Sequence, residues 1–504
     1  MTSVVNSPAL SLPVTQVRPL VWQRAALLAG GGGAVFLSRW LVRPGVADDY
    51  DSLNFLFGIS RSYDLKLFQP QFPGYPVFIA AGAALHGLGL SALSAAELVS
   101  ALASGLTGVA LAVIAWRLAG RGAAIAALLF HLMAWLPWLI GSGALSDALG
   151  TALVALSFAA LVGLSELESS EERPDIVGWP LLSGLAMGVA LGVRASYWPF
   201  AIALSIAAFR QGKTVRARAA TGFGLGALGW AVPFVSVVGP RQLIAIGKTH
   251  LVGHFEQWGG TVVTRPNLGL RLAATLRGLF YDGLAPWLPA LIALALLTVV
   301  VVALRPPGDR WKAAWTPVAL ICIPYALWAF FAQNIVEQPR HLLPLVEAEI
   351  LLLACVLSGL RSAVLCAAAL LAVCSVPLVC EREQTPPAAV QMLSWLRLND
   401  AGSDKVTWIV GTRSQRFFQE LAPDLDFHQS PWLSFLIAQL ARIDRMPDRI
   451  LLTSEVDLHS GEGDSRPLPR RWHVEPVSPN FCRDARIDRG QPCLQLSQLT
   501  WVPR

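Results

Sequence analysis

Hydrophobic residues along this chain form long runs separated by short polar stretches. A helix needs about 20 apolar residues to cross the hydrocarbon core of a bilayer, and fewer where flanking side chains reach the interface. On that criterion we expect about eleven membrane-spanning helices, which lie near 22–42, 95–117, 122–140, 144–164, 179–193, 196–210, 219–238, 284–304, 314–331, 342–360 and 362–379. The pattern predicts an α-helical polytopic membrane domain over residues 22–380, after an N-terminal tail of residues 1–21.

One further apolar segment, 74–90, decides the topology. If it lies along the membrane interface instead of crossing it, the basic clusters near 117–121, 210–218, 305–312 and 361 share the side of the N-terminus. Positive charge collects on the cytoplasmic side, so we predict an interfacial helix in this segment and a cytoplasmic N-terminus. The outer face then receives the loops 43–94, 141–150, 239–283 and 333–344, together with the C-terminal tail.

The tail beyond residue 380 has ordinary soluble composition. Strand-like and helix-like segments alternate in it, as in "VTWIVG", "RSQRFFQEL" and "RILLTSEV", which predicts a small extracytoplasmic α/β domain over 381–504. It contains no GxGxxG, no GKS/T loop and no zinc-type cysteine spacing, so we expect it to recognise or cover a ligand instead of catalysing. Cys482 and Cys493 can pair if this region faces an oxidising compartment.

Composition agrees with a membrane protein and changes the interpretation of the charge. The 504 residues are 54% hydrophobic and 14% charged, whereas soluble proteins carry about 25% charged residues. The formal net charge is +6, but the Lys and Arg residues lie in short hairpins between apolar runs. We therefore interpret them as topology signals and expect no nucleic-acid partner.

Three carboxylates, Asp48, Asp49 and Asp51, directly follow the first apolar run. Where a chain leaves the membrane, desolvation and mutual repulsion raise the pKa of at least one carboxylate in such a cluster. That is the environment of a general base. The alternative is a solvated loop that caps the next helix, for which Asp is a favoured residue type.

The segments "DDYDSLNFLFGI", "FPGYP" and "RHLLP" resemble those of the polyprenyl-phosphate-sugar-dependent glycosyltransferases of the GT-C superfamily, such as protein O-mannosyltransferases and aminoarabinose transferases. The resemblance covers roughly 20–200 and the "RHLLP" region. It implies that an Asp among Asp48, Asp49 and Asp51 is the catalytic base. Gln71 and Phe72 stand where relatives often have a His or Lys and a Pro.

The resemblance also implies roles for charged residues at the outer face. Arg340 and His341, with Arg194 as a second candidate, would bind the donor phosphate, for which a guanidinium offers a bidentate fork. The alternative for both arginines is snorkelling to lipid phosphate. Asp147 matches the second acidic position, which binds the acceptor or, in some branches, a divalent cation. Its alternative role is a helix N-cap.

A substrate pocket would be lined by residues of two outer loops, namely Gln71, Tyr75, His250, His254 and Trp258, in addition to Asp147. The two histidines have the i, i+4 spacing of a zinc pair, but the HExxH order is missing, and we predict no metal site; loop structure is the alternative to a pocket role. Trp258 suits stacking on a sugar or, equally, a place in the interfacial aromatic belt.

These features together predict an inverting glycosyltransferase of the bacterial inner membrane, with its C-terminal domain outside the cytoplasm. It would move a sugar from a polyprenyl-phosphate donor to a hydroxyl of a lipid, glycan or protein acceptor. No cofactor is required by the pattern, and a divalent cation stays open. The alternative is a non-catalytic carrier, flippase or scaffold for lipid-linked glycans. A transporter is expected to show internal repeats and midplane charges, whereas the unusual polar residues here collect at one rim.

Overall fold

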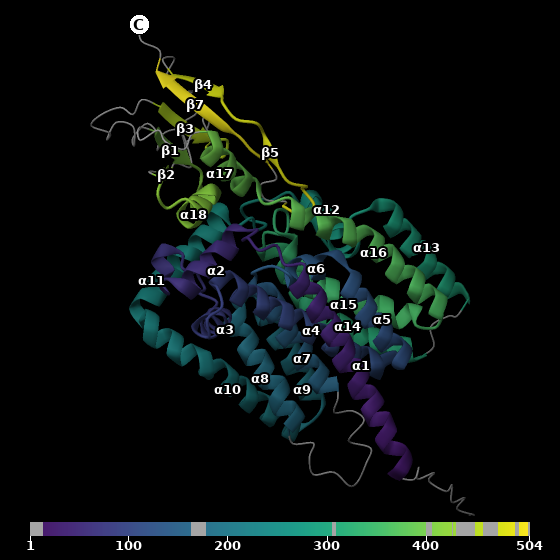
Figure 1. Ribbon diagram of the computed structural model, residues 1–504. Helices are drawn as coiled ribbons and strands as arrows, with labels where there is room; N and C mark the ends of the chain where they lie inside the picture. Colours follow the sequence, from purple (N-terminus) through teal and green to yellow (C-terminus); the bar gives the residue numbers. More distant parts are fainter. Residues whose placement is uncertain are drawn as a thin grey trace, which may run out of the picture.

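The computed structural model describes residues 14–162, 178–304, 309–399, 406–425, 427–429, 449–456, 472–488 and 493–501. Most of these residues are helical (Figure 1). In the first half the helices are α1 (Val14–Leu41), α2 (Tyr50–Ser60), η1 (Leu65–Leu67), α3 (Pro76–Gly87), α4 (Ala92–Ala119), α5 (Arg121–Met133), α6 (Trp135–Gly141), α7 (Ser146–Val162), α8 (Gly178–Val193), η3 (Ala195–Tyr197), α9 (Trp198–Arg210), α10 (Lys213–Val238) and α11 (Pro240–Val252). In the second half they are η4 (Gly253–Trp258), α12 (Leu268–Leu276), η5 (Arg277–Leu284), α13 (Leu288–Leu304), α14 (Asp309–Ala332), η6 (Pro339–Leu342), α15 (Leu343–Leu357), α16 (Arg361–Gln384), α17 (Ala388–Asn399) and α18 (Thr412–Leu421).

Several of these helices have the length and composition of membrane spans. Within the described ranges, three are long and apolar enough to cross a membrane alone, and up to five crossings result if each of two bent helix pairs counts as one. In one pair α5 meets α6 at 64°. The expected total of about eleven spans stays a prediction. The predicted interfacial segment contains α3, whose 12 residues are too few to cross a bilayer.

Glycines bring α8 and α10 into backbone contact. A Cβ atom at Gly184 would lie 1.9 Å from the carbonyl oxygen of Ala219, and one at Gly222 would lie 2.0 Å from the carbonyl oxygen of Leu181. Small residues allow this close approach between membrane helices. Because α8 ends one residue before Arg194, the contact also fixes where the Arg194 segment lies.

The C-terminal region forms a mixed sheet of order β2-β1-β3-β7-β4. In it β1 (Val406–Val410) is parallel to β2 (Phe427–Gln429) and β3 (Arg449–Thr453), while β7 (Leu496–Trp501) is antiparallel to β3 and β4 (Trp472–Pro476). A separate ribbon of β5 (Phe481–Cys482) and β6 (Cys493–Leu494) carries a disulfide between Cys482 and Cys493. The division of the chain at residue 380 into two separately folding domains stays a prediction.

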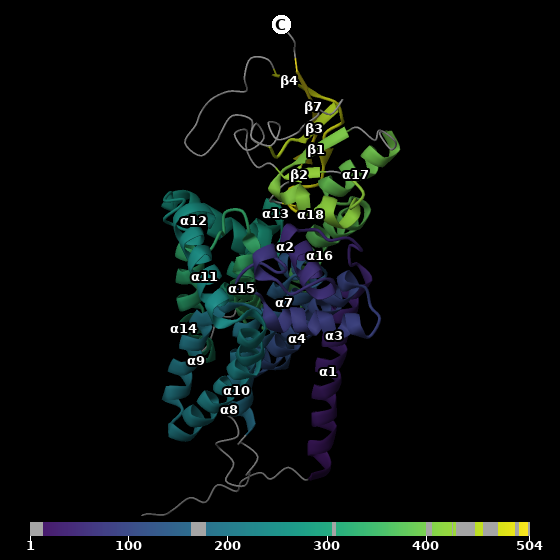
Figure 2. The ribbon, with the colours of Figure 1, turned by 90° about the vertical axis from the view of Figure 1, so that its left-hand side faces the viewer.

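The sheet lies beyond one end of the helical bundle, with α18 between it and α2 (Figures 1 and 2). Two arginines join the sheet region to the loop that follows α2. Arg61 Nη2 lies 2.9 Å from Glu420 Oε2, and Arg416 Nη2 donates to the carbonyl oxygen of Leu67 at 2.6 Å. The C-terminal region therefore packs on the segment that carries the acidic cluster.

Candidate active site

The start of α2 sets the directions of the three clustered carboxylates. Asp49 is the N-cap of this helix, and its Oδ1 accepts a hydrogen bond from the backbone N–H of Asp51 at 2.7 Å. Capping of this kind satisfies a backbone donor that has no partner inside the helix. Asp48 lies before the cap and Asp51 in the first turn, so neighbours in the sequence point to different partners.

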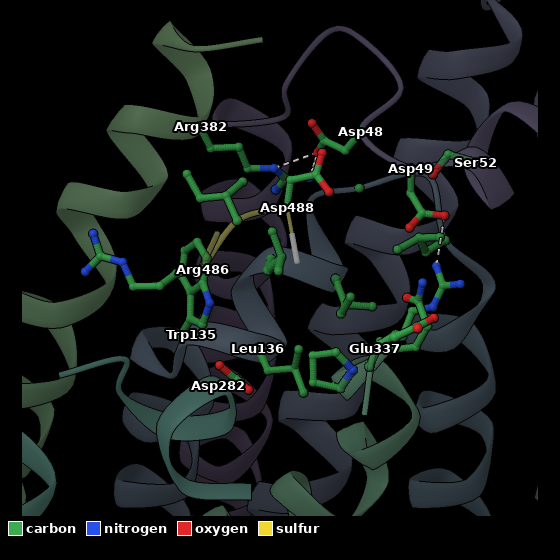
Figure 3. Close-up of a pocket in the computed structure, with 18 residues that line it drawn as sticks. Asp48, Asp49, Ser52, Trp135, Leu136, Asp282, Glu337, Arg382, Arg486 and Asp488 are labelled. Carbon is green, nitrogen blue, oxygen red and sulfur yellow. Dashed lines mark hydrogen bonds and ion pairs between the residues drawn. The ribbon is translucent and has the colours of Figure 1, made fainter. Parts of the chain in front are cut away.

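Asp48 is held between two buried arginines. Arg382, in the last turn of α16, donates from Nε to Asp48 Oδ2 at 2.7 Å, and Arg483, which follows β5, lies with Nη1 2.6 Å from Asp48 Oδ1. Burial alone would raise the pKa of Asp48, but the charges and hydrogen bonds of the two arginines lower it overall. Asp48 is therefore a carboxylate with both oxygens engaged, and Figure 3 shows its contact with Arg382.

Asp49 and Asp51 meet at Arg340 instead. This arginine lies in η6, with Nη1 3.2 Å from Asp49 Oδ1 and Nη2 hydrogen bonded to Asp51 Oδ2. It is 6% exposed, and its Nε has no hydrogen-bond partner among the described residues. Burial raises the pKa of Asp51 above its usual range, although Arg340 acts in the opposite direction. The structure thus brings together two of the three candidate carboxylates and the arginine expected to face them.

Arg194 forms a second buried charge centre beside the first. Its Nη1 lies 2.7 Å from Asp147 Oδ2 in the first turn of α7, and its Nη2 lies 3.0 Å from His341 Nδ1. Burial lowers the pKa of His341 well below its usual range, and the neighbouring arginines lower it further. His341 is therefore neutral, and its Nδ1 accepts the hydrogen bond from Arg194.

The possible divalent cation finds no ready site in this arrangement. Asp147, which matches the metal-binding position of some relatives, is paired with Arg194. In the described part of the chain, no group of three or more His, Cys, Asp or Glu side chains is placed to hold a metal ion. The Asp147 carboxylate therefore already has a cationic partner.

A cavity of about 500 Å³ opens beside these groups. The residues that line it include Asp51, Arg194, Arg340 and His341, and the predicted pocket residues Gln71, Tyr75, His250 and His254. Of the other two predicted pocket residues, Asp147 is not among those that line this cavity, and the side chain of Trp258 lies outside the described residues.

The turn that contains Gln71 and Tyr75 is held against the bundle. Tyr63 Oη donates to the carbonyl oxygen of Gly74 at 2.7 Å. Tyr75 has a φ of 48°, which is an outlier for a bulky residue, and its ring packs edge-on against Phe55 with centroids 4.8 Å apart. These contacts set the wall of the cavity and keep the Tyr75 backbone in its left-handed conformation.

A smaller cavity of about 80 Å³ lies on the other side of Arg340. Asp49 lines it together with Asp48, Arg382 and, from the C-terminal region, Arg486 (Figure 3). Asp51 lines only the larger cavity, whereas Arg340 and Gln338 line both. Arg340 therefore borders both cavities, of which the larger is lined by Asp51 and the smaller by Asp48 and Asp49.

Sequence reasoning missed the two arginines that hold Asp48. Arg382 carries a weak signal, because "CEREQ" places a charge pair directly after the last apolar run, at the predicted outer end. No local pattern marks Arg483, which lies within the tail. Its importance follows from the approach of β5 to the acidic loop.

Comparison with known proteins identifies the fold. No protein-family model and no curated protein matches the sequence. Among solved structures, ArnT from Cupriavidus metallidurans in the apo state matches with a TM-score of 0.52 and 13% identity over 96% of this chain and 98% of that one. The same protein bound to undecaprenyl phosphate matches with a TM-score of 0.51, 14% identity, and 95% and 98% coverage.

The archaeal oligosaccharyltransferase AglB from Archaeoglobus fulgidus gives a TM-score of only 0.46, at 9% identity over 86% of this chain and 69% of that one. The inference therefore depends on the two ArnT structures, and at such identities it concerns the fold alone. The described helices and the sheet together match nearly the full length of ArnT. The chain therefore shares the fold of ArnT, and this finding supports the resemblance drawn from the sequence.

Proposed function

We propose that this protein is a membrane glycosyltransferase that moves a sugar from a polyprenyl-phosphate donor to an acceptor hydroxyl. The observation that carries the proposal is the pairing of Asp51 with the buried Arg340 at the edge of a cavity of about 500 Å³. The shared fold supports it, because ArnT has been crystallised with undecaprenyl phosphate. The larger cavity is then the donor site.

The donor phosphate would bind between Arg340 and Arg194. Both guanidinium groups line the cavity, and planar guanidinium groups bind phosphate through two parallel hydrogen bonds. Arg340 has an Nε without a hydrogen-bond partner among the described residues, so it can donate to an incoming anion.

Asp51 suits the role of base better than its neighbours do. Asp48 has both oxygens bound by arginines, and Asp49 uses Oδ1 to cap α2. Asp51 borders the large cavity, and burial raises its pKa toward the range in which a carboxylate accepts a proton effectively.

The proposed reaction is a single displacement with inversion. The acceptor hydroxyl gives its proton to the Asp51 carboxylate, and its oxygen forms a bond to the anomeric carbon. The bond from that carbon to the phosphate oxygen breaks, and the electron pair stays on the phosphate. Arg340, with Arg194 beside it, stabilises the charge that develops there.

Asp51→Asn tests the role of the base. Transfer should fall by about 10²–10⁴, measured by mass spectrometry of glycolipids and glycans from cells that carry each variant. Binding of undecaprenyl phosphate to the purified variant should persist, whereas Arg340→Gln should lose it. Asp64→Asn is the matched control, because Asp64 lies in the same outer loop and only caps η1. Full transfer by Asp51→Asn would remove the proposed mechanism.

A further inference from the structure

The polar side chains around the donor cavity are mostly uncharged once the two arginines are set aside. They include four amides, from Gln71, Gln333, Asn334 and Gln338, and three imidazoles, from His250, His254 and His341. Among the described residues that line the cavity, Asp51 is the single carboxylate, and Arg340 already pairs with it. An ammonium group on a sugar would therefore meet no unpaired carboxylate among these residues.

The two histidines lie next to each other in the lining of the cavity. Their rings lie nearly parallel, at 7° with centroids 6.2 Å apart, and Phe72 packs 5.0 Å from the ring of His250. Burial lowers the pKa of His250 to about 4, and the neighbouring His254 contributes to this. His254 Nε2 lies 2.9 Å from the carbonyl oxygen of Ala332, so this nitrogen carries the hydrogen. The neutral imidazole of His250 suits a sugar hydroxyl as a hydrogen-bond partner.

Gln71 supplies an acceptor that lacks a donor. Its Oε1 is buried and has no hydrogen-bond partner among the described residues, although the side chain lines the cavity. A buried carbonyl oxygen without a hydrogen bond is costly, and a sugar hydroxyl would satisfy it. Trp198 and Trp328 border the same space and offer apolar surface to the C–H groups of a ring.

The charges that line the cavity disfavour both an amino sugar and a sugar acid. An ammonium group in this cavity would face Arg194 and Arg340 without an unpaired carboxylate to stabilise it. A carboxylate on the sugar would compete with the phosphate for the same two arginines.

We propose, building on the donor site proposed above, that the transferred sugar carries neither an amino nor a carboxylate group, and that Gln71, His250 and His254 recognise its hydroxyls. The donor is then a polyprenyl-phosphate-linked neutral hexose or pentose.

Binding to the purified full-length protein tests this inference. The ligands are undecaprenyl phosphate and three synthetic derivatives of it, which carry a neutral hexose, the corresponding amino sugar or the corresponding uronic acid. The neutral derivative should bind at least about tenfold more tightly than undecaprenyl phosphate alone, as expected for one added hydrogen bond to the sugar. The two charged derivatives should gain nothing.

The outcomes separate the two proposals. If undecaprenyl phosphate and all three derivatives fail to bind, the proposed function fails. If undecaprenyl phosphate binds and a charged derivative binds as tightly as the neutral one or more tightly, only the present inference is overturned.

Gln71→Glu provides a second, independent test. The new carboxylate should shift the preference toward the amino sugar by about tenfold or more. Gln69→Glu is the matched control, because Gln69 lies in the same turn but its side chain accepts a hydrogen bond from Ser62 and does not line the cavity. An unchanged preference in Gln71→Glu, or an equal change in Gln69→Glu, would contradict the role of Gln71.

Discussion

Arg483→Gln should loosen the acidic loop from a distance, because Arg483 joins the C-terminal region to Asp48. The side chain of Arg483 is fully buried, and its Nη1 lies 2.6 Å from Asp48 Oδ1. Its Nη2 also donates to the carbonyl oxygen of Arg382 at 2.9 Å. The substitution removes this charge but leaves Asp48 paired with Arg382, so the chain should still fold.

The magnitude follows from the environment of the pair. A hydrogen bond to a charged group contributes about 1.5–3 kcal/mol, and Asp48 is 16% exposed, so solvent screening is limited. We therefore expect the free energy that keeps the loop closed to fall by about 2 kcal/mol. Since 1.36 kcal/mol corresponds to a factor of ten, amide hydrogen exchange in the loop should accelerate about 30-fold.

Hydrogen exchange of the full-length protein, followed by mass spectrometry of a peptide from 43–60, measures this effect. Arg486→Gln is the control, because Arg486 is 37% exposed and pairs with Asp484, two residues away. The arginines lower the pKa of Asp48, so the contribution of the pair is fully present above the unfolded pKa of about 4. It is lost as pH falls through the lower, folded value. Equal exchange in Arg483→Gln and the native protein, or equal acceleration in both variants, would refute the reasoning.

Three further predictions concern packing and charge. Gly222→Ala should destabilise the protein by about 1–3 kcal/mol, because the new methyl group would overpack against α8. Gly224→Ala should not, because a Cβ atom there meets nothing within 4 Å. Thermal unfolding in detergent compares the two variants, and equal unfolding midpoints would contradict the contact. Asp147→Asn should lower the free energy of unfolding by about 3–5 kcal/mol, because it leaves Arg194 buried without its carboxylate. The same thermal assay measures this effect, and an unchanged midpoint would show that solvent reaches the pair. Transfer should increase with pH through an apparent pKa above 3.8, since burial raises the pKa of Asp51 and the base acts when deprotonated; a flat pH profile would argue against Asp51 as the base.

The hydrophobic pattern predicted where most of the long helices lie, because the preference of an apolar segment for lipid depends on its own residues and not on distant contacts. It did not find the 64° bend between α5 and α6, since the predicted span 122–140 runs through it without interruption. The predicted interfacial segment 74–90 does contain α3, which begins at Pro76, because the fixed φ of proline suits the first turn of a helix.

The candidate site was predicted as a set of residues and not as a set of pairs. Asp48, Asp49 and Asp51 looked alike in the sequence, and the alternative role of a helix cap also holds for Asp49. Their partners are far away along the chain: 289 positions separate Asp51 from Arg340, 334 separate Asp48 from Arg382, and 435 separate Asp48 from Arg483.

The sequence by itself determined that the chain is rich in apolar helices and that its unusual polar residues collect at one rim, because transfer from water to lipid depends on the composition of each segment. Only the tertiary structure decided which arginine faces which carboxylate, and that Arg340 borders two cavities. Those pairings depend on helix ends and a distant sheet meeting at one place, and no local pattern encodes such a meeting.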